Sequence, residues 1–270
     1  MERPIIALLT DFGTSDIYVA EMKAVILSIC PEAEIVDITH DIPRFNIRLG
    51  AIKLLEASRY FPEGTIHVGV VDPGVGTARR PIIVHAERHL YVGPDNGLLI
   101  PAAMQEGIKA VYHIENRKYL LPKISRTFHG RDIFAPTAAH LALGVKPSNF
   151  GRKIDDYVVI DLPKPRIVGN SIEGEILYID QFGNSITNIS EEMLHKIGIK
   201  DGCTLKVELE GREMRLRLVS AYGDAEVGEV LTIIGDNDLL EVSINRGNAA
   251  KSLNIKVGDR VRISLAEGRV

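Results

Sequence analysis

The first part of the chain alternates between continuous apolar runs and stretches with a helical repeat. Residues 4–12, PIIALLTDF, form an apolar run of strand length, typical of a strand buried on both faces. In residues 15–29, apolar side chains recur every three or four positions behind Ser15 and Asp16, which predicts a capped helix. The alternation continues through AEIVDITH, NIRLGAIKLLEASRYF, TIHVGVVDP, RPIIVHAE, HLYVGPDNG and RDIFAPTAAHLALG. We therefore expect an α/β domain with a largely parallel sheet over residues 1–162.

A different pattern begins near residue 160. The stretch DLPKPR has two prolines and no periodicity, which indicates a semi-rigid linker, expected at residues 163–169. Beyond it, short alternating runs are separated by hairpin signals at Glu210-Gly211 and around Gly235–Asp238. These features predict that residues 170–270 form a smaller all-β domain, a barrel.

Composition and charge narrow the class of protein without revealing its chemistry. The 270 residues are 45% hydrophobic and 25% charged, as in an ordinary globular protein of one large or two modest domains. A net charge of -4 gives no basic footprint for nucleic acid, and no apolar run approaches the ~20 residues of a membrane span. The start lacks signal-peptide features, and Cys30 and Cys203 are too isolated for a disulfide framework or a zinc site. We therefore expect a cytoplasmic protein that needs no metal.

Two motifs put charged side chains at the carboxyl ends of expected strands, where ligands bind in open α/β sheets. TDFGTSD sets Asp11 and Asp16 just after the first strand, although a helix cap is the alternative for Asp16. VDPGVGTARR ends a buried strand in Asp72, turns through two glycines and leaves through Arg79. A nearby arginine would keep such a carboxylate ionised. The pattern fits a reactive site, and on these residues alone it fits a structural ion pair that trims the loop equally well.

The remaining motifs carry less information individually. FHGRDIFAP puts His129 just before a helix that tolerates Pro136 in its early turns, where a side chain can face a pocket. In the second half, Asn184 lies in IDQFGNSITNI and Asn248 in INRGNAA, next to small residues that would let a flat base lie against the backbone. Asparagine can make paired hydrogen bonds to the edge of an adenine. Asparagine beside glycine is also typical of turns, so both interpretations stay open.

Together and in this order, the motifs resemble one family, the S-adenosyl-L-methionine (SAM) hydroxide adenosyltransferases, which are related to the SAM-dependent fluorinases and chlorinases. The motifs are TDFGTSD, VDITHDIP, FPEGTIHVGVVDPGVGTARR, GPDNGLL, FHGRDIFAP, IDQFGNSITNI and INRGNAA. The similarity runs from about residue 4 to the C-terminus. It implies an N-terminal α/β domain, a C-terminal β-barrel and a homotrimer with sites between neighbouring subunits. It also implies that water or hydroxide attacks the ribose C5′ of SAM and releases adenosine and methionine, with SAM as substrate and no cofactor.

The resemblance further implies roles for individual side chains. Asp72, Arg79 and His129 would form a catalytic triad that handles the water. The implied substrate contacts are Asp11 at the ribose hydroxyls, Asp16, Asp180 and Asp236 near the methionine portion, Phe45 and Tyr222 as apolar walls, and Asn184, Asn248 and Ala249 at the adenine.

Two other classes of function compete with SAM hydrolysis. A halogenase-type transferase on the same scaffold is disfavoured, because fluorinases carry Tyr in place of Asp72 and a carboxylate repels a halide at close range. Fluorinases also carry Tyr-Ser in place of His129-Gly130. A non-catalytic adenosine-binding protein would hold adenosine and form no methionine from added SAM. Within the preferred function, the sequence leaves open whether Asp72 or His129 takes the proton from water, or whether hydroxide is captured directly.

Overall fold

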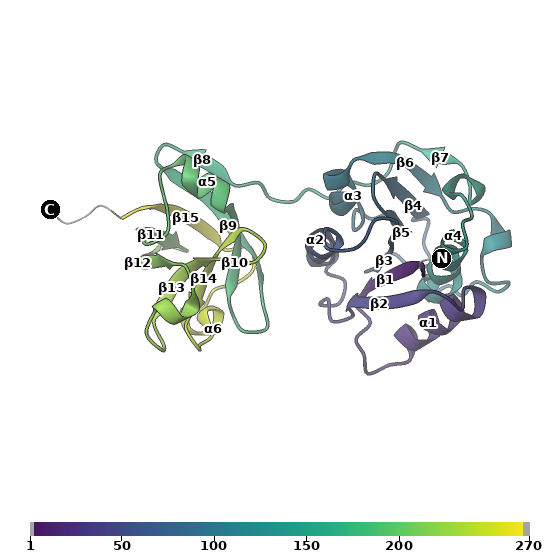
Figure 1. The fold of residues 1–270 in the computed structure, drawn as a ribbon, viewed down its shortest axis with the longest axis horizontal. Coiled ribbons are helices and arrows are strands. Elements are labelled where there is room, and N and C mark those ends of the chain that lie inside the picture. The colour runs from purple at the N-terminus through teal and green to yellow at the C-terminus, as the bar shows by residue number, and fades with distance from the viewer. Residues whose placement is uncertain (1–2, 267–270) are drawn as a thin grey trace. The chain divides into compact units, whose positions relative to one another are not determined.

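The structure is a computed structural model that describes residues 3–266. The chain divides into two compact units, Met1–Asp161 and Leu162–Val270 (Figure 1). Each unit has hydrophobic core clusters of its own, and each is described by itself. Residues 156–165 form no helix or strand. The short strand β8 (Arg166–Val168) occupies part of the range that the sequence suggested for the linker.

Within the described residues, the N-terminal unit contains one seven-stranded sheet. Its strands are β1 (Ile5–Thr10), β2 (Glu34–Thr39), β3 (Ile66–Val70), β4 (Pro81–Ala86), β5 (Leu90–Pro94), β6 (Ile108–His113) and β7 (Lys153–Ile154). The order is β2-β1-β3-β5-β4-β6-β7. The first four strands of this order are parallel, and β4, β6 and β7 join by antiparallel pairing. The expected α/β fold with a mostly parallel sheet is confirmed.

Helices cover both faces of this sheet (Figure 1). The helices are α1 (Tyr18–Ile29), α2 (Ile47–Ser58), α3 (Ile100–Glu106) and α4 (Ala135–Ala142), with the short η1 (Arg117–Tyr119), η2 (Gly130–Phe134) and η3 (Pro147–Asn149). α1 packs against α4 over a core that includes Met22, Ile26 and Phe134. α2 packs against α3 over a separate core that includes Leu54 and Leu98. The sheet is thus buried on both faces, which explains its continuous apolar runs.

The start of α1 differs from the sequence prediction. The helix begins only at Tyr18, and its N-cap, Ile17, makes no side-chain capping hydrogen bond. The expected cap by Ser15 or Asp16 is therefore wrong. Both residues are exposed in the loop that follows β1, so Asp16 is not committed to the helix end.

The entry to α4 is also different from the single α-helix that the sequence suggested. Residues 130–134 form a π-helical turn, in which the Ala135 N–H bonds the Gly130 carbonyl. Pro136 has no N–H, so the carbonyl of Asp132, four residues earlier, lacks its helical partner. That carbonyl instead accepts a hydrogen bond of 3.1 Å from the Leu121 N–H. The carbonyl that Pro136 leaves free therefore connects Leu121, in the preceding loop, to the start of the helix.

The C-terminal unit is a closed barrel of seven strands within the described residues. They are β9 (Ser171–Ile179), β10 (Ser185–Ser190), β11 (Thr204–Leu209), β12 (Arg212–Val219), β13 (Val230–Ile234), β14 (Leu239–Ile244) and β15 (Arg260–Leu265). The order β10-β14-β13-β12-β11-β15-β9 closes through pairing of β9 with β10. The short helices are α5 (Glu191–Lys196), η4 (Tyr222–Asp224) and α6 (Ala249–Leu253). The expected barrel is confirmed, as is the two-residue turn at Glu210-Gly211 between β11 and β12.

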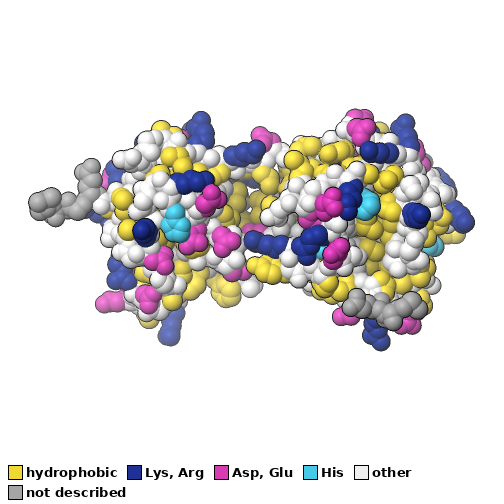
Figure 2. Space-filling model, turned by 45° about the horizontal axis from the view of Figure 1, so that its top comes forward, with side chains coloured by type: hydrophobic (Ala, Val, Ile, Leu, Met, Phe, Trp, Pro, Cys, Tyr) yellow, Lys and Arg dark blue, Asp and Glu magenta, His cyan; other side chains and the backbone are white. Residues whose placement is uncertain are grey.

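The surface shows no single dominant charge on the face in view in Figure 2, where acidic and basic side chains are interspersed on each unit. This agrees with the small net charge of the chain. No helix within residues 3–266 is long and apolar enough to cross a membrane.

Candidate active site

The loop between β3 and β4 pairs a carboxylate with a guanidinium. Arg79 Nε donates to both carboxylate oxygens of Asp72 at 3.0 Å, and Arg79 Nη2 also donates to Asp72 Oδ2. Both side chains are nearly buried, with exposed fractions of 5% for Asp72 and 9% for Arg79. Buried charges are tolerated only when they are paired and hydrogen-bonded. The guanidinium therefore compensates the carboxylate and fixes the two ends of the loop to each other.

A glycine in this loop allows close approach to a second segment. Gly76 has φ +77°, a conformation that L side chains rarely adopt. A Cβ at this position would also clash with the carbonyl oxygen of Arg126. The turn can therefore lie directly against residues 125–129, which brings Arg79 next to His129.

His129 completes the contact between the two segments. Its Nδ1 lies 2.9 Å from Arg79 Nη2. A guanidinium can only donate, so Nδ1 accepts this hydrogen bond, and the proton of a neutral ring is on Nε2. Burial lowers the pKa of His129 below its ordinary value, and the positive charge of Arg79 lowers it further. The structure thus brings Asp72, Arg79 and His129 into one hydrogen-bonded chain that ends in a neutral imidazole.

One donor of this chain has no acceptor. Arg79 Nη1 is buried and makes no hydrogen bond to any residue that the structure describes. The Phe134 ring lies beside the guanidinium, with 5.3 Å between Arg79 Cζ and the ring centroid. A buried N–H group without a partner costs about 1–3 kcal/mol, and more when it is charged. A small oxygen ligand at Nη1 would remove this cost.

Asp11 lies at the carboxyl end of β1. Its Oδ2 accepts a hydrogen bond of 2.8 Å from the Phe45 backbone N–H. Phe45 has φ +66°, which is uncommon for a residue other than glycine, and its side chain is 66% exposed. A strained residue with an exposed apolar ring is a feature of ligand sites, and here the Asp11 carboxylate fixes its backbone.

Three aromatic rings attach the Asp11 loop to the His129 segment. The ring centroid of Phe12 lies 5.9 Å from that of Tyr18 and 5.8 Å from that of Phe128. The Tyr18 and Phe128 centroids are 5.1 Å apart. Because Phe12 follows Asp11 and Phe128 precedes His129, the cluster brings the loop after β1 close to the triad.

The C-terminal unit gathers most of the other expected contacts around a pocket of its own. Asp180, Asn184, Tyr222 and Asp236 all line this pocket. Asn184 Nδ2 donates to Asp180 Oδ2 at 2.9 Å and to the Tyr222 hydroxyl oxygen at 3.3 Å. The Tyr222 O–H in turn donates to Glu241 Oε2 at 2.9 Å. The pocket therefore has an ordered polar wall, rich in carboxylates.

Asn248 and Ala249 lie next to this wall and have structural contacts of their own. Asn248 caps α6, and its side-chain oxygen accepts a hydrogen bond of 2.7 Å from the Lys251 N–H. A Cβ on Gly183 would clash with the Asn248 side chain, and the Gly183 carbonyl accepts from the Ala250 N–H at 2.9 Å. Ala249 is buried. These contacts fix residues 180–184 to the start of α6, and an adenine contact at Asn248 and Ala249 remains an expectation.

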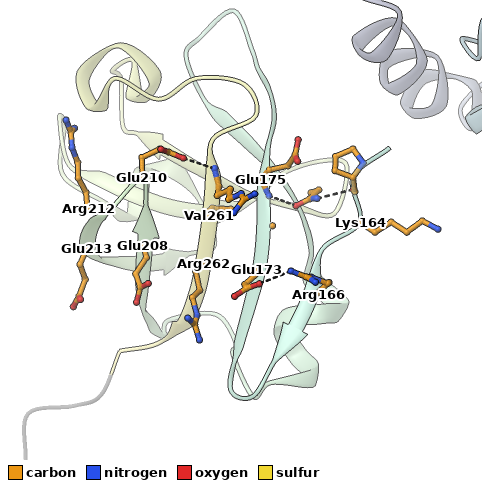
Figure 3. A pocket seen from close by; sticks show the side chains of 15 residues that line it. Lys164, Arg166, Glu173, Glu175, Glu208, Glu210, Arg212, Glu213, Val261 and Arg262 are labelled. Carbon is orange, nitrogen blue, oxygen red and sulfur yellow. Dashed lines mark hydrogen bonds and ion pairs between the residues drawn. The ribbon is translucent and has the colours of Figure 1, made fainter. Parts of the chain in front are cut away.

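A second hollow of the C-terminal unit contains none of the expected site residues. It crosses the outer side of β9, β11, β12 and β15 (Figure 3). Acidic and basic side chains alternate along it, as in the pair of Arg166 and Glu173, whose charged atoms are 3.3 Å apart. Because neither sign dominates, this hollow has no clear preference for a charged ligand.

Comparison with known families now decides the relationship. The model of the SAM hydroxide adenosyltransferase N-terminal domain matches residues 6–151, and that of the C-terminal domain matches residues 174–262. The chain belongs to the SAM hydroxide adenosyltransferase family. The resemblance inferred from the sequence motifs is thereby confirmed.

Relatives of this chain match over nearly their whole length. Proteins of Salinispora tropica and Thermus thermophilus, each 39% identical, are named (R)-S-adenosyl-L-methionine hydrolase; the chain is covered to 97%, and the two relatives to 98% and 99%. A fluorinase of Actinoplanes is 31% identical, and the match covers 97% of this chain and 98% of the fluorinase. Among solved structures, an uncharacterized conserved protein of Thermotoga maritima has a TM-score of 0.93 and 38% identity, covering 96% of this chain and 99% of that one.

Sequence reasoning missed two buried carboxylates near the expected site residues. Glu241, on the pocket wall, belongs to the face of β14 opposite the core residues Leu240 and Val242. A charged residue inside an apolar strand was the available signal. Asp132 lies three residues after His129 and is also buried. It follows an arginine in the sequence, and nothing there distinguished it from a surface ion pair.

Proposed function

We propose that this protein hydrolyses SAM at the ribose C5′ and releases adenosine and L-methionine. Four curated relatives at 35–39% identity are named (R)-S-adenosyl-L-methionine hydrolase, which supports this reaction and the R sulfonium epimer as substrate. The observation that carries the proposal is the buried chain of Asp72, Arg79 and His129, with its unpaired donor at Arg79 Nη1. This arrangement holds an ionised carboxylate in place as a base for a small oxygen nucleophile.

The charge of the substrate determines what the protein must supply. The C5′–S bond breaks with its electron pair going to sulfur, so the sulfonium leaves as a neutral thioether and needs no acid. The oxygen of water bonds to C5′ and must lie in line with the breaking bond. Such positioning can lower a barrier by ~7–11 kcal/mol in the most favourable intramolecular cases. Asp72 would hold this oxygen and accept a proton from it, while Arg79 keeps the carboxylate ionised and in place.

We assign the proton to Asp72 and not to His129. The support is the orientation of the imidazole, because Nδ1 already accepts from Arg79 and the ring proton is on Nε2. His129 then has no free lone pair for water, and it serves to orient the guanidinium. As the general base, Asp72 would typically add ~10²–10⁴-fold to the rate. The proton passes from Asp72 to solvent after methionine leaves.

The remaining expected residues would bind the rest of SAM. Asp11 would accept hydrogen bonds from both ribose hydroxyls, with Phe45 beside it as an apolar wall. In the other unit, Asn184 and the backbone at Asn248 and Ala249 would contact the adenine, and Tyr222 would form an apolar wall. The acidic side chains Asp16, Asp180 and Asp236 would attract the positively charged methionine portion.

We also propose a homotrimer with sites shared between neighbouring subunits, as the family resemblance implies. Its support is the division of the expected contacts between two separate units, with the triad in one and the adenine residues in the other. No cofactor takes part in the proposed reaction, since SAM itself carries the leaving group. The cytoplasm is the compartment that we propose, because Cys30 and Cys203 are both free, as is usual in a reducing compartment.

A product assay tests this function against its two competitors. The protein is incubated separately with the R and S sulfonium epimers of SAM, with and without chloride or fluoride, and the products are identified by mass spectrometry. We expect equal amounts of adenosine and methionine, faster from the R epimer and independent of halide. A halogenated deoxyadenosine would favour a halogenase, and pre-bound adenosine without methionine formation would favour a binding protein. Either result contradicts the proposal.

A further inference from the structure

Asn184 is held by two acceptors in the pocket of the C-terminal unit. The residue lines that pocket and is 8% exposed. Its Nδ2 donates one hydrogen to Asp180 Oδ2 at 2.9 Å and the other to the Tyr222 hydroxyl oxygen at 3.3 Å. A carboxylate can only accept, so the amide nitrogen, and not the amide oxygen, faces Asp180. The neighbours of Asn184 therefore fix the orientation of its amide.

This orientation leaves Oδ1 as the free polar atom of the Asn184 side chain. Both hydrogens on Nδ2 are used, and Oδ1 accepts no hydrogen bond from any residue that the structure describes. The atom is not fully buried, so solvent or a ligand can reach it. A ligand group that pairs with this side chain in the pocket must therefore be a hydrogen-bond donor.

A buried carboxylate fixes the hydroxyl that completes this arrangement. Glu241 is 7% exposed, and its Oε2 accepts from the Tyr222 O–H at 2.9 Å. Burial, followed by the charge of Glu241, raises the pKa of Tyr222 to about 12, so the phenol keeps its proton. Because this single proton is directed to Glu241, the phenol oxygen has only lone pairs to offer to Asn184. Glu241 thus makes Tyr222 an acceptor for the amide.

Without Glu241, the Asn184 amide would have two nearly equivalent orientations. If the amide turned over, its oxygen would accept from the freed Tyr222 O–H, and its nitrogen, a donor, would be offered to the pocket. The turned amide would lose its bond to Asp180 and gain one from Tyr222. With Glu241 present, the turned amide would lose both contacts, so only the observed orientation is stable.

We propose that Glu241 is a positioning residue that, through the Tyr222 hydroxyl, makes Asn184 present an acceptor to the pocket and so selects purines with an amino group at C6 over purines with an oxo group there. The 6-amino group of adenine donates a hydrogen bond, whereas a 6-oxo group would set one acceptor against another. The proposal rests on the placement of adenine at Asn184 in the proposed function, and it adds the residues that determine which base is accepted.

Nucleoside binding tests this selection without SAM turnover. The affinities of the wild-type protein for adenosine and for inosine, a 6-oxopurine nucleoside, are measured by calorimetry. The pH is 8, because burial raises the pKa of Glu241 and the test concerns its ionised form. We expect adenosine to bind at least about 50-fold more tightly, since a site built around a donor of its ligand rejects analogues that lack that donor. Equal affinities overturn the proposal.

The variant that tests the role of Glu241 is Glu241→Met, because methionine has a similar length and offers no strong acceptor. We expect the preference for adenosine to fall about 10-fold, as for the loss of one hydrogen bond to a charged group.

The double variant Glu241→Met, Tyr222→Phe should recover this preference. No hydroxyl remains to accept the turned amide, Asp180 still holds the Asn184 nitrogen, and phenylalanine keeps the apolar wall. We expect a preference within about threefold of the wild type, so the two changes are strongly non-additive. Recovery by a second substitution is not expected if Glu241 only supports the fold.

The matched control is Ser243→Ala. Ser243 is buried, and its Oγ donates to the same Oε2 of Glu241 at the longer distance of 3.5 Å. This change leaves the contact between Glu241 and Tyr222, so we expect the wild-type preference.

Unchanged preference in Glu241→Met, or a double variant that prefers neither nucleoside, overturns the proposal; the double variant decides if the single variant does not fold. A wild-type protein that binds neither nucleoside contradicts the adenine site of the proposed function and this proposal with it. A wild-type protein that selects adenosine but does not hydrolyse SAM contradicts the proposed reaction alone.

Discussion

At the scale of the residue, the site depends on Arg79 making several directed contacts at once. Nε and Nη2 hold Asp72, Nη2 also reaches His129, and Nη1 is unpaired among the described residues. The sequence grouped these three residues only through the family resemblance. From spacing alone, a loop-trimming ion pair was an equal alternative. The acceptor role of Nδ1 could not be predicted, because it depends on two segments 50 positions apart meeting in space.

The first prediction concerns Arg79→Lys. Lysine keeps the charge beside Asp72, but a single ammonium cannot hold both carboxylate oxygens and also reach His129. We expect turnover per folded molecule to fall by roughly 10²-fold or more, as for the loss of a directed donor in other active sites, and the melting temperature to fall as well, because the buried bidentate pair is weakened. Steady-state kinetics and calorimetry on one preparation measure both quantities.

The control for this variant is the neighbouring Arg80→Lys. Arg80 pairs with Asp95 and Asp156, each with a nitrogen–oxygen distance of 2.7 Å, and takes no part in the triad. The Arg80→Lys variant should have a lower melting temperature than the parent, and its turnover per folded molecule should stay near parental. Parental turnover by Arg79→Lys would show that the directed contacts are unimportant.

At the scale of the element, the apolar periodicity of the sequence predicted the strands and helices. The prediction failed where contacts with other parts of the chain decided the local structure. The buried face of α1, with Val19, Met22 and Ile26, followed from apolar spacing. The expected cap did not, because the loop after β1 leaves Ser15 and Asp16 exposed. The π-helical turn before α4 could not be inferred from the sequence. In this turn the Asp132 carbonyl accepts a hydrogen bond from the Leu121 N–H, and nothing in the sequence indicates that Leu121 lies nearby.

A buried histidine in β3 gives the sheet its own pH dependence. His67 is 0% exposed, and neither of its ring nitrogens has a hydrogen-bond partner within residues 3–266. Its ring stacks on Tyr91 at a centroid distance of 5.0 Å and contacts His89 at 4.9 Å. Burial, and then the nearby His89, lowers the pKa of His67 from 6.5 to about 3. The folded protein therefore holds this ring neutral at every pH above about 3.

The second prediction is that His67→Phe flattens the acid branch of the stability curve. Below pH 6.5 the unfolded chain binds a proton at His67 that the folded chain does not, so the free energy of unfolding falls as pH drops from 6.5 toward 3. The slope from one such group is about 1.4 kcal/mol per pH unit. Between pH 6.5 and pH 5, the parent should lose about 2 kcal/mol more than the variant in urea unfolding. The control is a change at an exposed histidine, His195→Gln, which should lose as much unfolding free energy as the parent over this pH range. A His67→Phe variant that loses as much as the parent would contradict the account.

At the scale of the whole molecule, the third prediction concerns the sharing of sites between subunits. An inactive Asp72→Ala protein is mixed with an Asn184→Ala protein, and the subunits are allowed to exchange. If each site takes its triad from one subunit and its adenine contacts from a neighbour, a 1:1 mixture recovers about a quarter of the parental activity, because both halves are intact in that fraction of sites.

The control is a mixture of Asp72→Ala with Arg79→Ala. Both changes lie in the same unit, so no site of the mixture regains an intact triad, and activity should stay at the level of the parents. If exchange is demonstrated by mass spectrometry and the first mixture is no more active than the control, each site lies within a single subunit.

The central claim, that Asp72 takes a proton from water held against C5′, is tested most directly by SAM turnover of Asp72→Asn in H₂¹⁸O. The account predicts that parental protein forms adenosine with ¹⁸O at the 5′ position. It predicts that the folded variant still binds SAM and forms this product at least roughly 10²-fold more slowly per folded molecule. A stable Asp72→Asn protein with nearly parental turnover, or parental adenosine without ¹⁸O, would contradict the account.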